Sequence, residues 1–120
     1  MDKKILLVDD AAFMRMLIKD TLTKAGYTSI IEAADGDIAC QMYESDKPDL
    51  VVMDITMPNK TGIEALAEIK SKNPAAKVIM CSAMGQEAMV VEAIKLGALD
   101  FIVKPFKPDR ILQTVGKILN

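Results

Sequence analysis

The sequence contains no histidine and only two cysteines among its 120 residues. Cys40 and Cys81 lie in apolar segments, without C-x-x-C spacing and without histidine to complete a zinc site. We therefore expect two buried, free thiols and no structural zinc.

Long apolar runs are also missing. The longest ones, such as 5–8 and 50–53, fall far short of the roughly 20 residues that a membrane-spanning helix needs. Asp2-Lys3-Lys4 leads directly into a strand-like run, which is not the pattern of a signal peptide. These features predict a cytoplasmic protein that is not inserted in a membrane.

A surplus of positive charge is missing as well. The chain has 15 Lys and Arg against 17 Asp and Glu, a net charge of -2, and its basic residues are scattered without interleaved aromatics. Nucleic-acid binding is therefore not expected, because it depends on a clustered basic surface. The composition favours a protein or a small anion as the partner.

The composition is that of an ordered globular protein, with 51% hydrophobic and 27% charged residues. A chain of this length buries roughly two thirds of its unfolded surface when it folds, enough for one core. With no linker, internal repeat or tail evident, we expect residues 1–120 to form a single domain.

Short β-branched runs alternate along the chain with segments of helical spacing. Four of the five runs lack polar alternation, as strands covered on both faces do, and the weakest, 29–31, suits a sheet edge. Strand, helix, strand order with right-handed crossovers predicts an α/β fold, doubly wound, with a parallel sheet and helices on both faces. The expected strands are 5–8, 29–31, 50–53, 78–81 and 101–103, and the helical segments are 13–22, 38–42, 63–67, 89–94 and 111–119.

Residues typical of helix ends support the predicted helices. The segment from Thr61 to Glu64 has the form of a capping box, and Pro108 suits the first turn of the last helix. Gly26 and Gly97 stand where helices end.

Polar side chains gather where four of the predicted strands end. They are Asp9 and Asp10, Asp54, Ser82 and Lys104. In an open parallel sheet these ends meet at one edge, where ligands bind. Three carboxylates raise one another's pKa unless a cation separates them, and Mg²⁺ is the divalent ion that favours a few carboxylates together with phosphoryl oxygens. The pattern predicts phosphoryl transfer to Asp54 as nucleophile.

Each of these residues has a plainer interpretation on its own. Asp10 could cap the first helix, Ser82 could bond to backbone, and Lys104 could be a solvated surface lysine. Asp54 is harder to dismiss, because a charge that ends an apolar strand usually needs a partner. Their joint occurrence at strand ends favours the functional interpretation.

Other proteins with related folds fit the sequence less well. A P-loop kinase is excluded because the chain has no G-x-x-x-x-G-K-[ST] run. A flavodoxin-like electron carrier needs a hydroxyl- and glycine-rich phosphate loop where Asp9-Asp10-Ala11-Ala12 stands, and an aspartyl phosphatase needs a second acid where Thr56 stands.

Four motifs lie at these strand ends. They are Val8-Asp9-Asp10, Met53-Asp54-Ile55-Thr56-Met57-Pro58 with Gly62, Ser82-Ala83, and Val103-Lys104-Pro105-Phe106. With them the chain resembles, from residue 4 to 119, the receiver domains of two-component response regulators, and most of all the stand-alone chemotaxis regulators. The resemblance implies a (βα)5 flavodoxin-like fold with strand order 2-1-3-4-5.

The resemblance also implies a role for each site residue. Asp54 would be the phosphoacceptor. Asp10, Asp54 and the Thr56 carbonyl would bind Mg²⁺ directly, with Asp9 acting largely through water. Lys104 and Ser82 would contact the phosphoryl oxygens. Phe101 stands at an aromatic switch position that is tyrosine in the best-known chemotaxis regulators, so a phenolic hydrogen bond is lost here.

Two further expectations come from the resemblance. The Lys104-Pro105 bond is expected to be cis, against a base rate of about 5–6% for X-Pro bonds. Thr56 and Met84 stand at positions where family members tune the lifetime of the phosphorylated state, and Met84 has no group to orient an attacking water, which points to slow self-dephosphorylation.

The expected partners are a histidine kinase, a flagellar motor switch or other output protein, and a phosphatase, with the chain itself a monomer. It would not be a conventional enzyme, although it would promote its own phosphorylation and autodephosphorylation. A phosphorelay intermediate or another single-domain regulator outside chemotaxis uses the same residues, so the sequence of the site leaves both roles open.

Overall fold

The computed structural model describes residues 3–120, in which five strands alternate with five helices. This is the predicted order along the chain. The elements are β1 (Lys4–Val8), α1 (Ala12–Lys24), β2 (Ser29–Ala33), α2 (Gly36–Asp46), β3 (Leu50–Asp54), α3 (Gly62–Lys72), β4 (Val78–Ser82), α4 (Glu87–Lys95), β5 (Asp100–Val103) and α5 (Pro108–Leu119).

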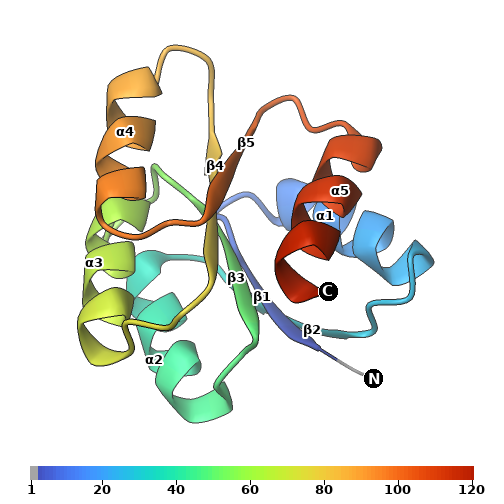
Figure 1. Cartoon of the computed structure of the whole chain (residues 1–120), viewed down its shortest axis with the longest axis horizontal. Coiled ribbons are helices and arrows are strands. Elements are labelled where there is room, and N and C mark those ends of the chain that lie inside the picture. The colour runs from blue at the N-terminus through green and yellow to red at the C-terminus, as the bar shows by residue number, and fades with distance from the viewer. Residues whose placement is uncertain (1–2) are drawn as a thin grey trace.

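All five strands form one parallel sheet with the order β2-β1-β3-β4-β5 (Figure 1). This confirms the expected fold class and strand order, and it places β2 at an edge as its weaker apolar pattern predicted. Strands β3 and β4 are buried along their whole length. The uninterrupted apolar runs in the sequence therefore correspond to strands covered on both faces.

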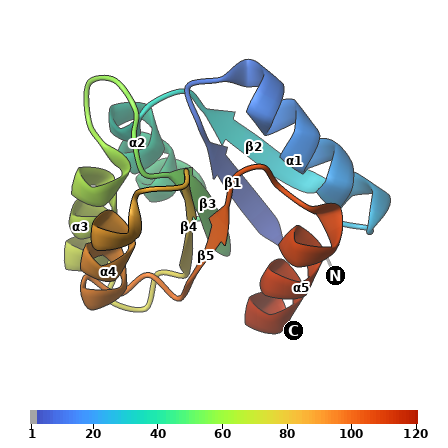
Figure 2. The ribbon, with the colours of Figure 1, turned by 90° about the horizontal axis from the view of Figure 1, so that it is seen from above.

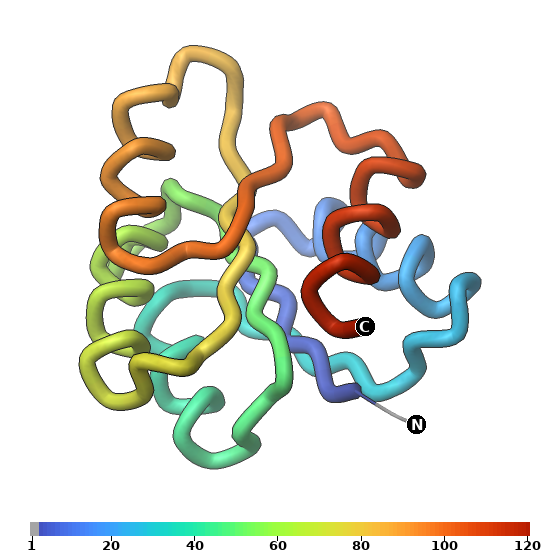
Figure 3. Tube along the Cα trace, in the orientation of Figure 1, coloured from blue at the N-terminus to red at the C-terminus, as the bar shows by residue number. Residues whose placement is uncertain are grey.

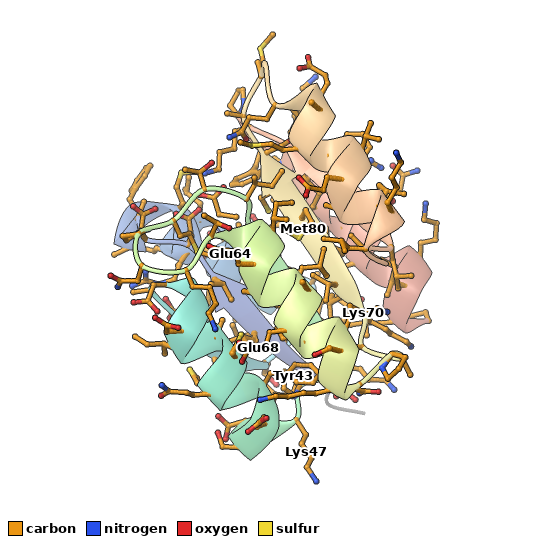
Figure 4. All side chains as sticks on the ribbon, turned by 90° about the vertical axis from the view of Figure 1, so that its left-hand side faces the viewer. Tyr43, Lys47, Glu64, Glu68, Lys70 and Met80 are labelled. Atoms are coloured by element: carbon orange, nitrogen blue, oxygen red, sulfur yellow. The ribbon has the colours of Figure 1, made fainter. Side chains whose placement is uncertain are left out.

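The helices cover the two faces of the sheet unequally. Figure 2 shows α1 and α5 together on one side, with α2, α3 and α4 on the other. Each face has its own core: one cluster includes Leu6, Met53 and Met80, and the other includes Ile5, Leu50 and Ile79. Figure 4 looks onto the three-helix face, where Met80 lies beneath the helices. Alternate residues of the same strands thus supply both cores.

The residues predicted to mark helix ends are confirmed, although the helices extend beyond the predicted segments, as α2 (Gly36–Asp46) does beyond 38–42. Thr61 and Glu64 form both hydrogen bonds of a capping box at the start of α3. Pro108 lies in the first turn of α5. Gly26 and Gly97 follow α1 and α4 with φ of 102° and 110°, backbone angles that few other residues adopt without strain.

Two site residues are part of strands and do not simply follow them. Asp54 is the last residue of β3 and Ser82 the last residue of β4, so sheet hydrogen bonds fix the backbone of both. The tube in Figure 3 shows the loops after β4 and β5 leaving the sheet at the same end. Cys40 and Cys81 are buried and free, as expected. No helix within residues 3–120 is long and apolar enough to cross a membrane.

Candidate functional site

The sheet brings the predicted polar residues to one edge. Asp54 is aligned with Cys81 of β4, and Ser82 with Val103 of β5, immediately before Lys104. Asp9, Asp54 and Ser82 are three of the four buried polar or charged residues of the described chain, with exposed fractions of 3%, 6% and 2%. Polar groups at this depth cost free energy unless they have partners, so their clustering points to a site.

Three carboxylates meet at this edge. Asp9, Asp10 and Asp54 each offer an oxygen, and these oxygens lie within 4.8 Å of one another. Asp9 and Asp54 are buried whereas Asp10 is exposed, so the cluster opens to solvent on one side. An all-oxygen donor set with an open side suits a hard cation that keeps several waters, which is the preference of Mg²⁺. The residues present therefore fit the predicted metal.

Lys104 supplies the positive charge of the cluster. Its Nζ lies 3.1 Å from Asp54 Oδ2 and 3.3 Å from Asp9 Oδ2, and donates a hydrogen bond to each. Burial pulls the pKa of Lys104 down, but the attraction and hydrogen bonds of Asp54 and Asp9 outweigh it and raise the pKa. Lys104 is therefore held as an ammonium between two carboxylates and is not the solvated surface lysine of the plainer interpretation.

The buried position of the Asp54 carboxyl disfavours its charge. Burial raises the pKa of Asp54, and the charge of Asp9 adds to the rise. Lys104 and the backbone N–H of Thr56 act in the opposite direction without reversing it. The ionised form is thus incompletely compensated by the protein alone, and a divalent cation beside it would complete the compensation.

Asp9 and Asp10 have different surroundings. Asp9 Oδ1 accepts a hydrogen bond of 2.9 Å from the Ala11 N–H, while its other oxygen faces Lys104. Asp10 does not cap α1, because Ala11 occupies the N-cap position and no side chain caps that helix end. The helix-cap interpretation of Asp10 is therefore wrong, and its exposed carboxylate is available for a ligand.

The loop after Asp54 folds back tightly against its own strand. The Gly62 N–H donates to the Ile55 carbonyl at 2.7 Å, and a Cβ at Gly62 would lie only 2.0 Å from the Asp54 carbonyl oxygen. Only glycine allows this approach. Met57 is buried within the loop, with 6% of its surface exposed. Thr56 therefore lies between the end of β3 and a buried side chain, which restrict the movement of its backbone.

The two predicted switch residues lie on the neighbouring strands β4 and β5, where Ser82 is aligned with Val103 and Phe101 with Met80. Ser82 is buried at the end of β4. Phe101 is partly buried and lines an apolar groove of about 740 Å³ between α4 and β5. The same groove is lined by Ser82 and by Val90 and Ile94 of α4, so the site and the groove share a wall. The predicted cis bond at Lys104-Pro105 is present.

Two residues that the sequence did not single out also contact the site. Arg15 of α1 donates to the Asp9 carbonyl oxygen at 2.5 Å and pairs with Glu32 of β2 at 2.9 Å. Gln86 bonds to both Thr56 and Ala83, in the loops that follow β3 and β4. A polar residue just before a helix is a weak sequence signal, and nothing in the pattern around Arg15 or Gln86 indicates which loop each would reach.

Comparison with known proteins defines the class. Residues 5–116 match the response regulator receiver domain family, and the chain belongs to it. It is 58% identical over 118 residues to "Chemotaxis protein CheY" of Thermotoga maritima, covering 98% of both chains, and 57% identical to that of Bacillus subtilis, covering 100% of both. The crystal structure of the receiver domain of NtrX from Brucella abortus aligns with a TM-score of 0.92 and 36% identity, over 97% of this chain and 98% of that one.

These relations establish the chain as a two-component response regulator closely related to the chemotaxis regulators. Such a receiver is a signalling protein and not a conventional enzyme.

Proposed function

We propose that the chain is a switch that a histidine kinase phosphorylates on Asp54 in a Mg²⁺-dependent reaction. The observation that carries this proposal is the buried Asp54 carboxylate, within reach of two further acids and bonded to the Lys104 ammonium. The cluster contains three carboxylates and only one lysine. A divalent cation bound between the carboxylates would offset this surplus of negative charge.

In the proposed reaction, a carboxylate oxygen of Asp54 attacks phosphorus. The new O–P bond forms as the P–N bond to the kinase histidine breaks, and the imidazole leaves with the bonding electron pair. Mg²⁺ held by Asp10, Asp54 and the Thr56 carbonyl, with Asp9 acting largely through water, would neutralise charge on the transferring group. Lys104 already lies against Asp54 and needs only a small movement to contact a phosphoryl oxygen.

Ser82 and Phe101 carry the change to the surface in this proposal. The Ser82 hydroxyl donates to a phosphoryl oxygen, and the loop after β4 moves with it. Phe101 then turns toward the space that the loop leaves. Both residues line the apolar groove beside α4, so a change at Asp54 alters the shape of a surface on which a partner can dock.

The proposed output is phosphorylation-dependent binding to a partner protein, with the flagellar motor switch the first candidate. The chemotaxis proteins that this chain resembles over nearly their full length support this role. A phosphorelay intermediate outside chemotaxis is the second candidate, because it would use the same residues. Slow autodephosphorylation, together with a separate phosphatase, would return the switch to its resting state. The side chain of Met84, exposed beside the site, supports a slow rate because it has no polar group to orient an attacking water.

Phosphorylation of the purified chain with acetyl phosphate and Mg²⁺ tests the chemistry. Intact-mass measurement should show one added phosphoryl group on the wild type, stable in acid and lost in base, and none on Asp54→Asn. Asp109→Asn, at an exposed position in the first turn of α5, is the matched control and should label as the wild type does. Equal labelling of Asp54→Asn would remove Asp54 from the role of acceptor.

A further inference from the structure

Gln86 precedes α4 but does not cap it. It occupies the N-cap position of the helix, yet its side chain makes no cap hydrogen bond there. The side chain turns back instead: Oε1 accepts from the Ala83 N–H at 2.7 Å, and Nε2 donates to Thr56 Oγ1 at 2.9 Å. One amide group therefore spans two loops.

The two partners of Gln86 both adjoin the proposed phosphorylation site. Thr56 lies two residues after Asp54, and its backbone N–H bonds to the Asp54 carboxylate. Ala83 directly follows Ser82. Within residues 3–120, the bond from Gln86 to Thr56 is the only side-chain hydrogen bond that joins loop 55–61 to loop 83–86. A movement that separates the two loops stretches or breaks this bond.

Loop 83–86 has little else to hold it. Ala83, Met84 and Gly85 are exposed, with Met84 at 82%, and Gly85 has a φ of 91° and open space around the position of a Cβ. A segment with so few apolar contacts opens at low cost, so the two bonds of Gln86 contribute a large share of its order.

We propose that the Gln86 side chain is a tether that stabilises the unmodified arrangement of loop 83–86. It is a positioning residue that lowers the affinity of the Asp54 site for a phosphoryl group. The reasoning rests on the proposed function: drawing the Ser82 hydroxyl toward a group on Asp54 moves Ala83, the next residue, away from Gln86. The tether breaks in that movement, so it favours the resting state by the free energy of its bonds.

Beryllofluoride with Mg²⁺, a mimic of the phosphoryl group, provides the test. Removing the amide in Gln86→Leu should tighten beryllofluoride binding by about three- to tenfold, the equivalent of one net hydrogen bond. NMR titration gives the dissociation constant. Gln41→Leu, an exposed glutamine within α2, is the matched control and should bind as the wild type does. Gln86→Ala, which adds no apolar surface, should behave as Gln86→Leu does.

Two further readouts separate a tether from a general loss of structure. In unliganded Gln86→Leu, the amide resonances of Ser82 and Phe101, neither of which is a hydrogen-bond partner of Gln86, should lie on the line between the wild-type free and bound positions. Thr56→Val removes the other end of one of the two bonds, and the double variant Thr56→Val with Gln86→Leu should bind little tighter than Gln86→Leu alone, because Gln86→Leu already removes the bond to Thr56.

The outcomes are distinct for the two proposals. A wild-type protein that binds no beryllofluoride in the presence of Mg²⁺ would overturn the proposed function, and the tether with it. If the wild type binds beryllofluoride but both Gln86 variants bind it with the same or a lower affinity, the tether alone is overturned. Fully additive effects of Thr56→Val and Gln86→Leu on that affinity would also overturn it.

Discussion

At the scale of single residues, the site is defined by an imbalance of charge. Asp9 and Asp54 share one lysine, with Lys104 Nζ 3.3 and 3.1 Å from their oxygens, and Asp10 adds a third carboxylate with no ion pair to it within the described chain. The buried acids depend on Lys104, whereas the exposed Asp10 does not. Removing Asp10 should therefore harm ligand binding without harming the fold.

We expect Asp10→Ala to lose most Mg²⁺ binding while remaining folded. The loss should exceed the roughly 10–100-fold effect of removing an outer partner of a metal ligand, because Asp10 is proposed to touch the ion directly. The metal-free protein should be as stable as the wild type or more so, since one repulsion is removed. Calorimetric titration and thermal unfolding measure the two effects, with the exposed Asp20→Ala in α1 as control. Normal Mg²⁺ affinity in Asp10→Ala would exclude Asp10 as a ligand.

The substitution Lys104→Arg tests whether the shape of the side chain matters in addition to its positive charge. Arginine keeps the positive charge but replaces a compact ammonium by a planar fork that fits the space between Asp9 and Asp54 differently. We expect this variant still to be phosphorylated by acetyl phosphate yet to bind its output partner poorly when phosphorylated. Lys107→Arg, exposed just before α5, is the control. Full phosphorylation-dependent partner binding by Lys104→Arg would contradict a switching role for Lys104.

At the scale of elements, the start of α3 fixes the loop that follows the acceptor. The capping box closes this loop: the Glu64 N–H donates to Thr61 Oγ1, and the Thr61 N–H donates to Glu64 Oε1. Figure 4 shows Glu64 at the beginning of α3. The hydrogen bonds from Thr61 lower the pKa of Glu64. The carboxylate therefore adds stability above its unfolded pKa, and that stability is lost as the pH falls through its folded pKa.

Substitutions at the capping box should lower stability in a pH-dependent way. We expect Thr61→Ala to reduce the free energy of unfolding at pH 7 by about 0.5–2 kcal/mol. Glu64→Gln should flatten the fall in stability on acidification below the unfolded pKa of glutamate, and Glu92→Gln, exposed in α4, should leave it unchanged. Urea unfolding at a series of pH values measures both effects. If the free energy of unfolding of Glu64→Gln falls with decreasing pH as that of the wild type does, this carboxylate adds nothing to stability.

The elements were largely predictable from the sequence because each has a local cause. The apolar runs of β3 and β4, the capping box and Pro108 act within a few residues of where they stand. Strand ends were less predictable: β2 continues to Ala33 although its pattern indicated an end at residue 31. Its extension depends on pairing with β1, where Val8 is aligned with Ala33, and that pairing is not visible in the local sequence.

At the scale of the whole molecule, the parallel sheet brings residues that are far apart in the sequence together in one site. Because the final residues of parallel strands share one edge of the sheet, Asp9, Asp54, Ser82 and Lys104 could be grouped from their places in the sequence. Arg15 and Gln86 could not, because their partners depend on how loops and helix ends are oriented. The sequence thus predicts groups carried by the sheet better than contacts made by loops.

The last prediction concerns communication across the molecule. Asp54 and Phe101 lie on different strands, joined through β4, with Ser82 and the apolar groove between them. Moving the partly exposed Phe101 ring to a fully buried position should gain at most about 1.5–3 kcal/mol, which biases a two-state equilibrium without locking it.

We therefore expect beryllofluoride to perturb NMR resonances from Asp54 through Ser82 to Phe101 and on to Val90 and Ile94 in the groove. Phosphorylation should raise partner affinity by roughly 5–150-fold, the typical range for coupling between two sites. Phe101→Ala should reduce this gain while leaving labelling of Asp54 intact, because the ring lies outside the acid cluster. Ile118→Ala, partly buried in α5 against the opposite core, is a control for the loss of apolar volume and should keep the gain. If the perturbation ends at Ser82, or if Phe101→Ala keeps the full gain in affinity, the signal leaves the site by another route.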